Sequence, residues 1–175
     1  MFWMNSFKWS KHSILAFAII AAWIKTVIVY LTSFDLGIEN GMQYFILIIN
    51  PLSFLLFIYG ISLFFKTAKV RNRYIIGTSL ILSVVLYGNV AFYRFYNDFI
   101  TLPVLFQTSN FGDLGSSAAA IINWFDFLYF ADVILLLAFM KFMPVLKEQF
   151  TIRKDVRRAY FVMAVAMLFL NLGLT

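Results

Sequence analysis

The 175-residue chain is 63% hydrophobic, contains 22 phenylalanines, has only 13% charged residues and carries a formal net charge of +6. Soluble domains average about 45–50% apolar and about 25% charged residues, so this composition excludes an ordinary soluble domain. It predicts an all-α integral membrane protein, because continuous apolar runs cross a bilayer as helices, whereas strands of a membrane barrel alternate apolar and polar residues. The sequence has no cysteine, which excludes disulfides and thiol chemistry.

Five apolar runs approach the roughly 20 residues that cross about 30 Å of hydrocarbon. The predicted transmembrane helices cover residues 14–32, 42–65, 74–93, 116–142 and 159–174. A signal peptide is the alternative for the first run, because Lys8 and Lys11 precede it. However, this run is longer than the apolar part of a typical signal peptide and contains Lys25. A membrane helix is therefore favoured, with residues 1–12 as an interfacial anchor.

The distribution of lysine and arginine predicts the orientation of the chain. With the N-terminus in the cytoplasm, twelve of the fourteen basic residues lie on the cytoplasmic side. These are Lys8, Lys11, Lys66, Lys69, Arg71, Arg73, Lys141, Lys147, Arg153, Lys154, Arg157 and Arg158. Five crossings then place the C-terminus outside the cell. We expect the basic connectors to contact anionic headgroups of the inner leaflet. Nucleic-acid binding is disfavoured, because these connectors are short loops tied at both ends.

The third and fourth predicted helices are joined by an outer loop that is rich in hydrogen-bonding and aromatic residues. Residues 93–117 read YRFYNDFITLPVLFQTSNFGDLGSS, and the mixture predicts a segment that lies in the membrane interface. Its candidate lipid or substrate contacts are Arg94, Tyr96, Asp98, Gln107, Asn110, Asp113 and Ser116. An arginine fork suits a phosphate group, and a helix that starts near Ser116 would favour an anion. Alternatively, Asp113 and the serines only cap the fourth helix.

Four polar residues within the predicted helices are further candidates. These are Lys25, Asn50, Asn89 and Asp132. At about 1.5 Å per residue, Lys25 and Asp132 both lie roughly 10 Å below the outer boundary, so they can pair if the first and fourth helices touch. Two interpretations stay open for these groups. They form a buried ion pair and interhelical hydrogen bonds, or they line a polar recess that admits a lipid headgroup.

The sequence shows no catalytic or metal-binding constellation. His12 is the only histidine, which excludes a His-based triad and a paired-His metal site. No Gly-rich phosphate loop of a recognised kind is present. Asp98 and Asp113 could act as acid and base, but their spacing of fifteen positions fixes no geometry. We therefore expect no catalytic residue, metal ligand or cofactor site in this chain.

The outer-loop segment, residues 93–117, resembles the loop between the third and fourth membrane helices of lipoteichoic acid synthases from Gram-positive bacteria. The layout of the whole chain is also similar to their membrane domain. The resemblance implies five N-terminal helices followed by an extracellular domain of the alkaline phosphatase/sulfatase type. It further implies a phosphoglycerol transferase that takes glycerol phosphate from phosphatidylglycerol and extends a polyglycerolphosphate chain on a glycolipid anchor.

In that family, a threonine nucleophile and a manganese-type divalent metal belong to the extracellular domain. The last predicted helix reaches the end of the sequence without a polar flank, so we expect the chain to be part of a longer protein. No catalytic residue can be carried over, and a synthase cannot be separated from a primase paralogue that adds the first unit.

The sequence thus predicts a multi-pass domain in a bacterial cell membrane that anchors a catalytic domain and presents phosphatidylglycerol or the growing chain. Its expected partners are membrane lipids, including the glycolipid anchor, and its own extracellular domain, but not nucleic acid. The alternative is a free-standing multi-pass subunit, regulator or small transporter without catalysis. The sequence predicts no particular oligomeric state.

Overall fold

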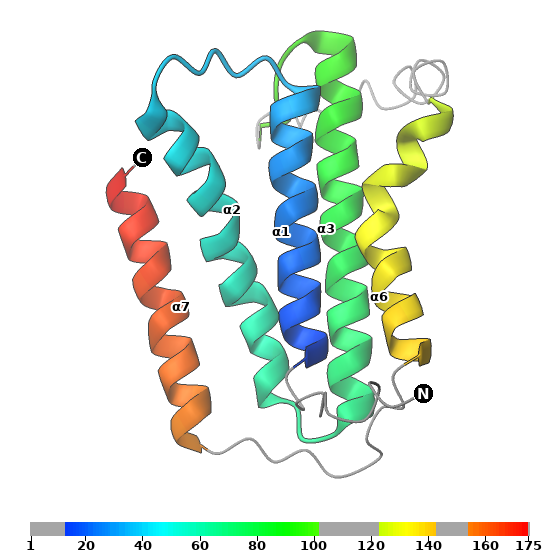
Figure 1. The fold of residues 1–175 in the computed structure, drawn as a ribbon, viewed down its shortest axis with the longest axis vertical. Coiled ribbons are helices and arrows are strands. Elements are labelled where there is room, and N and C mark those ends of the chain that lie inside the picture. Colours follow the sequence, from blue (N-terminus) through cyan, green and yellow to red (C-terminus); the bar gives the residue numbers. More distant parts are fainter. Residues whose placement is uncertain (1–12, 102–122, 143–153, 175) are drawn as a thin grey trace, which may run out of the picture.

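The computed structural model describes residues 13–101, 123–142 and 154–174, and every regular element within them is helical (Figure 1). The elements are α1 Ser13–Ser33, α2 Gly41–Gly60, η1 Ile61–Phe64, α3 Ala68–Tyr96, η3 Trp124–Phe130, α6 Ala131–Phe142 and α7 Lys154–Leu174. Within the described residues, four helical segments are long and apolar enough to cross a membrane: 14–33, 41–64, 68–96 and 154–173. The predicted all-α class is therefore confirmed for this part of the chain.

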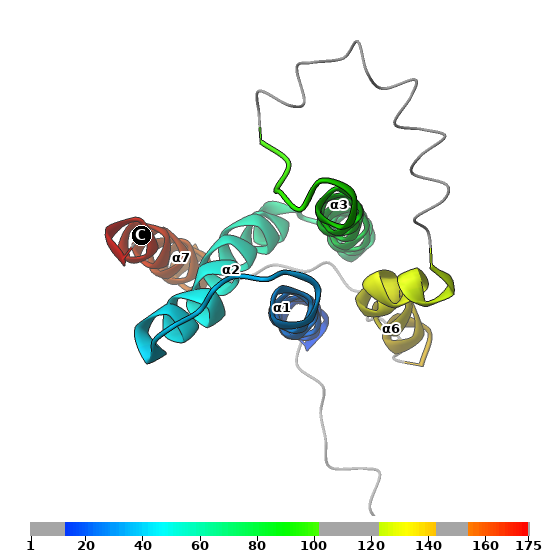
Figure 2. The same ribbon diagram turned by 90° about the horizontal axis from the view of Figure 1, so that it is seen from above.

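The helices form a bundle in which α1 is central. Seen along the helices, α1 lies between α2 and α6, while α3 lies beside it and α7 is outermost (Figure 2). Helix α1 contacts α2, α3 and α6, whereas α7 packs chiefly against α2. Consequently α6 and α7, which are consecutive helices of the described chain, occupy opposite edges of the bundle (Figures 1 and 2).

Two helix starts differ from the predicted ones, and a capping residue explains the first of them. Helix α3 begins at Ala68 rather than at residue 74, because Thr67 is its N-cap and accepts the Val70 N–H at 3.4 Å. Hydropathy marked only the apolar part of this helix, so Lys69, Arg71 and Arg73 lie on its first turns and not in a connector. Helix α7 likewise begins at Lys154 rather than at residue 159.

The fourth predicted helix, residues 116–142, differs from the structure at its start. Residues 116–122 lie outside the described chain, and Asn123 has an extended backbone at the N-cap of η3. The Asp126 carboxylate accepts the Asn123 N–H at 2.9 Å, which fixes this start. A short 3-10 helix, η3, and then α6 follow, so the described helical stretch begins at Trp124.

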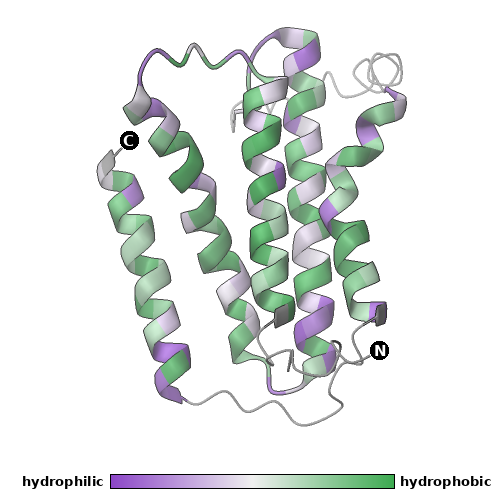
Figure 3. Ribbon diagram, in the orientation of Figure 1, coloured by the Kyte–Doolittle hydropathy of each residue, from purple (hydrophilic) through white to green (hydrophobic). Residues whose placement is uncertain are grey.

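The bundle core combines large apolar side chains with small residues. Ala18 and Ala22 of α1 are each 2% exposed, and small residues of this kind allow membrane helices to approach closely. Tyr59 of α2, Ile75 of α3 and Leu136 of α6 belong to the same buried cluster. Many large apolar side chains are exposed, among them Ile20, Ile81 and Phe169. Most of each helix is hydrophobic, and hydrophilic residues gather chiefly toward the ends of the bundle (Figure 3). This distribution is the one expected for a bundle whose solvent is lipid.

Candidate functional site

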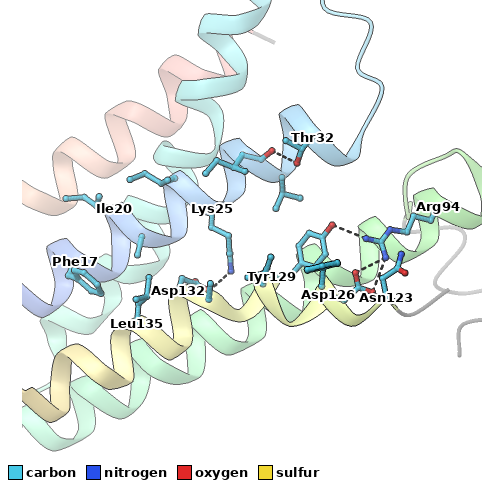
Figure 4. Close-up of a pocket in the computed structure, with 17 residues that line it drawn as sticks. Phe17, Ile20, Lys25, Thr32, Arg94, Asn123, Asp126, Tyr129, Asp132 and Leu135 are labelled. Carbon is cyan, nitrogen blue, oxygen red and sulfur yellow. Dashed lines mark hydrogen bonds and ion pairs between the residues drawn. The ribbon is translucent and has the colours of Figure 1, made fainter. Parts of the chain in front are cut away.

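Lys25 of α1 and Asp132 of α6 form a buried ion pair, as the sequence predicted. Lys25 Nζ lies 2.7 Å from Asp132 Oδ1, and the side chains are 10% and 3% exposed. An unpaired charge at this depth would be costly, so each side chain requires the other. The pair also fixes α6 against α1 at the level shown in Figure 4.

Ser83 of α3 completes this cluster and was not among the predicted candidates. Its hydroxyl accepts a hydrogen bond from Lys25 Nζ at 2.6 Å. The single hydroxyl hydrogen is shared between the Ser79 carbonyl, at 2.7 Å, and Asp132 Oδ1, at 3.2 Å. Ser79 and Tyr59 are joined by a further hydrogen bond of 2.6 Å between their hydroxyl oxygens. Polar groups from α1, α2, α3 and α6 therefore meet in one network inside the bundle.

A second ion pair lies at the opposite end of α3 from its basic first turns. Arg94, in the last turn of α3, lies 2.9 Å from Asp126 Oδ1 and donates to Asp126 Oδ2 at 3.0 Å. Arg94 also donates to the Tyr129 hydroxyl at 3.2 Å, and Tyr87 donates to Asp126 at 3.0 Å. Arg94 was a predicted site residue, whereas Asp126, Tyr129 and Tyr87 were not. The arginine fork is thus already held by a carboxylate and a phenol.

An open groove of about 720 Å³ runs between α1 and the η3–α6 stretch and contains both ion pairs in its wall (Figure 4). Most of the lining is apolar. It includes Phe17, Ile20, Ile24 and Ile28 from α1, and Leu128 and Leu135 from the other side. Thr32 lies at the end near Arg94, and its hydroxyl is turned inward to the Ile28 carbonyl at 2.8 Å. The groove is therefore long and mostly apolar, with polar groups at one end and midway along it.

The two ion pairs present their cations, more than their carboxylates, to the surroundings. The Arg94 side chain is 28% exposed against 7% for Asp126, and Lys25 is 10% exposed against 3% for Asp132. The four charges cancel in number, so the wall has no net charge. Its accessible charge is nevertheless positive at the Arg94 end, because the guanidinium is more exposed than the Asp126 carboxylate.

The remaining predicted residues lie away from the groove lining. Asn50 accepts a hydrogen bond from Asn171 Nδ2 at 2.7 Å, which joins α2 to α7. Asn89 donates to the Val85 carbonyl at 3.1 Å and accepts the Ile100 N–H at 3.3 Å. These contacts give both asparagines a structural explanation.

Three of the seven outer-loop candidates are described, Arg94 among them, and four are not. Tyr96 is exposed and its ring centroid lies 4.5 Å from that of Phe92, while Asp98 Oδ1 accepts the Phe99 N–H at 2.7 Å. Gln107, Asn110, Asp113 and Ser116 lie outside the described residues. Among the residues that the structure describes, no group of three His, Cys, Asp or Glu side chains could hold a metal ion.

The chain matches a known family over almost its full length. Residues 3–175 match the model of the lipoteichoic acid synthase N-terminal domain. Lipoteichoic acid synthase 2 of Bacillus subtilis is 40% identical over 167 residues, which are 93% of this chain and 25% of that protein. Lipoteichoic acid synthase of Staphylococcus aureus is 33% identical over 166 residues, which are 93% of this chain and 26% of that protein.

A third relative, the lipoteichoic acid synthase-like protein YvgJ of Bacillus subtilis, is 43% identical over 127 residues, which are 73% of this chain and 20% of that protein. No solved structure matches the chain. The chain spans about a quarter or less of the length of these relatives. The match over residues 3–175 shows that the chain belongs to the lipoteichoic acid synthase family, as an N-terminal membrane domain.

Proposed function

We propose that this domain anchors an extracellular phosphoglycerol transferase domain and presents to it phosphatidylglycerol or the growing polyglycerolphosphate chain. The groove between α1 and η3–α6, with the Arg94 guanidinium exposed at one end, is the observation that carries the proposal. Family membership supports the anchoring role, because the relatives are about four times as long as this chain or longer. The threonine nucleophile and the manganese-type metal would belong to that further part, and the glycolipid anchor would be a partner of the whole enzyme.

The proposed topology has five crossings, with the N-terminus in the cytoplasm. Besides the four long helices, the η3–α6 stretch is the remaining crossing, the fourth in chain order. Its 7 and 12 residues have a combined rise of about 32 Å at about 2.0 and 1.5 Å per residue. That rise matches a hydrocarbon core of about 30 Å. The basic first turns of α3 and α7 lie at the same end of the bundle, which supports a cytoplasmic location for that end (Figure 3). Arg94 then faces the outside.

The dimensions of the groove suit one acyl chain of a phospholipid. From Phe17 to Thr32 the wall of α1 rises about 22 Å at 1.5 Å per residue. One leaflet of a 30 Å core is about 15 Å thick, so the groove is long enough for an acyl chain that spans one leaflet. The apolar lining would hold the chain below the headgroup. The headgroup phosphate would then lie against Arg94, whose positive charge is more exposed than the Asp126 carboxylate behind it.

Filling the groove tests this proposal in the intact enzyme. Ile28 lines the groove and is 53% exposed, so Ile28→Trp would occupy space there while all four ion-pairing residues stay unsubstituted. Ile81 of α3 is 64% exposed and does not line the groove, so Ile81→Trp is the matched control. We expect I28W to lower polyglycerolphosphate synthesis in cells at an unchanged protein level, while I81W retains it. Equal synthesis by both variants would contradict the proposed role of the groove.

A further inference from the structure

A second cavity, of about 620 Å³, lies at the basic end of the bundle, where η1 meets the first turns of α7. Its described lining consists of Phe64, Lys154, Asp155, Arg157, Arg158 and Phe161. The groove beside α1 has no net charge, whereas this cavity has an excess of positive charge from three cations and one carboxylate. None of these residues belongs to the outer loop or to the two buried ion pairs.

Aromatic contacts hold one of the cations in a defined position. The Arg157 guanidinium carbon lies 5.0 Å from the centroid of the Phe64 ring, a distance typical of a cation–π contact. Phe161 meets Phe64 edge to face at a centroid distance of 6.1 Å. Arg157 is therefore positioned by η1 and α7 together and does not extend freely into solvent.

The α2–α7 contact next to this cavity is close. The Tyr160 hydroxyl donates to the Leu56 carbonyl at 2.9 Å. A Cβ atom added to Gly60 would lie only 2.5 Å from Tyr160 Cε1, so the glycine permits this approach. The cavity thus has two walls whose separation is fixed by neighbouring contacts, although α7 packs chiefly against α2 alone.

The occupant must be both anionic and amphiphilic. Three cations select a negative group, and arginine pairs particularly well with phosphate oxygens. Phe64 and Phe161 are 50% and 40% exposed on the surface that faces lipid. Lys154 and Arg158 lie in the first turns of a helix of membrane-spanning length, which is the level of the headgroups. A free phosphate would leave the aromatic surface uncovered, whereas a phospholipid would cover it with its glycerol and acyl chains.

We propose that this cavity binds the headgroup phosphate of an anionic phospholipid from the leaflet at the basic end of the bundle. The bound lipid would connect η1 to α7 and so steady the helix that packs chiefly against one neighbour. This inference is independent of the groove proposed to present substrate, because the two sites share no residue. It goes beyond a general attraction of basic loops to the membrane, because it assigns the binding to one cavity.

Lipid titration of the purified protein in detergent tests this site. The probe is phosphatidylserine, an anionic lipid without the glycerol headgroup of the proposed substrate, with phosphatidylcholine as the uncharged reference. Native mass spectrometry gives the bound stoichiometry and affinity, and thermal unfolding gives the stabilisation. We expect one phosphatidylserine to bind in preference to phosphatidylcholine and to raise the unfolding temperature.

Charge-removing variants localise the effect. The double variant R157Q/R158Q should weaken phosphatidylserine binding by about thirtyfold, as expected for two charges at the membrane surface. The control K69Q/R73Q removes two charges from exposed residues in the first turns of α3, at the same end of the bundle but outside the cavity. This variant should bind phosphatidylserine as the unsubstituted protein does. An equal loss in both double variants, or equal binding of the two lipids, would overturn the proposal.

A further variant keeps the test valid if R157Q/R158Q does not fold. Asp155→Asn removes the carboxylate from the cavity and should strengthen phosphatidylserine binding several-fold. Unchanged or weaker binding by a folded D155N protein would contradict the site. I28W should leave the phosphatidylserine binding that depends on Arg157 and Arg158 unchanged, because Ile28 does not line this cavity. Failure of the groove proposal would be seen separately, as unchanged polymer synthesis by I28W.

Discussion

Lys25 and Asp132 are 107 residues apart in the chain, yet their charged atoms lie 2.7 Å from each other inside the bundle. Their contact joins α1 to α6, and Ser83 of α3 binds both. Three helices therefore depend on one cluster whose charges are nearly sealed from the surroundings. The cluster therefore has a structural role, and any contact with a lipid would be a second role.

Removing one partner of this pair should be much more harmful than removing both. Lys25→Leu leaves a buried carboxylate without its cation, and we expect a loss of about 3–5 kcal/mol in the free energy of unfolding. The double variant K25L/D132L removes both charges and should recover most of that loss. Thermal or denaturant unfolding in detergent measures the cycle. Equal destabilisation by the single and double variants would show that the charges do not depend on each other.

The same double variant separates the two interpretations that the sequence left open. If the intact enzyme with K25L/D132L folds and makes polymer at the normal rate, the pair has only a structural role. Reduced synthesis at a normal protein level would instead show that these polar groups act on the lipid beside them.

Ser83→Ala should cost about 1–3 kcal/mol of stability, because it removes a hydrogen-bond partner from Lys25 and from Asp132 in a buried site. Tyr59→Phe removes the hydroxyl that pairs with Ser79 and should cost about 1 kcal/mol. Unfolding measurements on the two variants provide the comparison. A larger effect of Y59F than of S83A would mean that the network is anchored at α2 and not at the ion pair.

Depth along the helices placed Lys25 and Asp132 at the same level, because each helix rises by a constant amount per residue. Their pairing depended on a contact between α1 and α6, which the structure supplies. The contact between Arg94 and Asp126 was not predicted. That contact depends on η3, where the Asp126 carboxylate turns back to accept the Asn123 N–H. Two opposite charges at equal depth were the available signal.

The positions of Ser83 and Tyr129 show a second limit of the sequence. Serines are common in membrane helices, and nothing in the sequence distinguishes Ser83 from those that satisfy their own helix. Only the packing of α3 against α1 and α6 brings its hydroxyl to the ion pair. The helix starts at Ala68 and Lys154 were also missed, since polar first turns carry no hydropathy signal.

Gly60 permits the close approach of α7 to α2, so Gly60→Ala should weaken it. The added methyl group would lie 2.5 Å from Tyr160 Cε1, and the ring cannot move away without straining its hydrogen bond to Leu56. We expect a loss of about 1–3 kcal/mol in unfolding free energy. Gly77→Ala is the control, because nothing lies within 4 Å of a Cβ at that position. Equal stability of G60A and G77A would contradict this packing.

The absence of native cysteine allows a direct test of the five-crossing topology. Single cysteines would be placed at Lys69, Asp98, Trp124 and Lys141, all of which are exposed. Intact cells would then be treated with a membrane-impermeant maleimide. Asp98→Cys and Trp124→Cys should react in intact cells, whereas Lys69→Cys and Lys141→Cys should react only after permeabilisation.

The Trp124 and Lys141 positions decide whether the η3–α6 stretch crosses the bilayer. They lie near its two ends, and the intervening rise of about 32 Å is enough for one crossing. Labelling of both positions from the same side would mean that the stretch turns back within the membrane. The five-crossing topology would then be wrong. It would no longer support a contact between Arg94 and a lipid headgroup at the outer surface. Opposite labelling would instead place Arg94, Asp126 and the outer loop on the side where the family's catalytic domain is proposed to act.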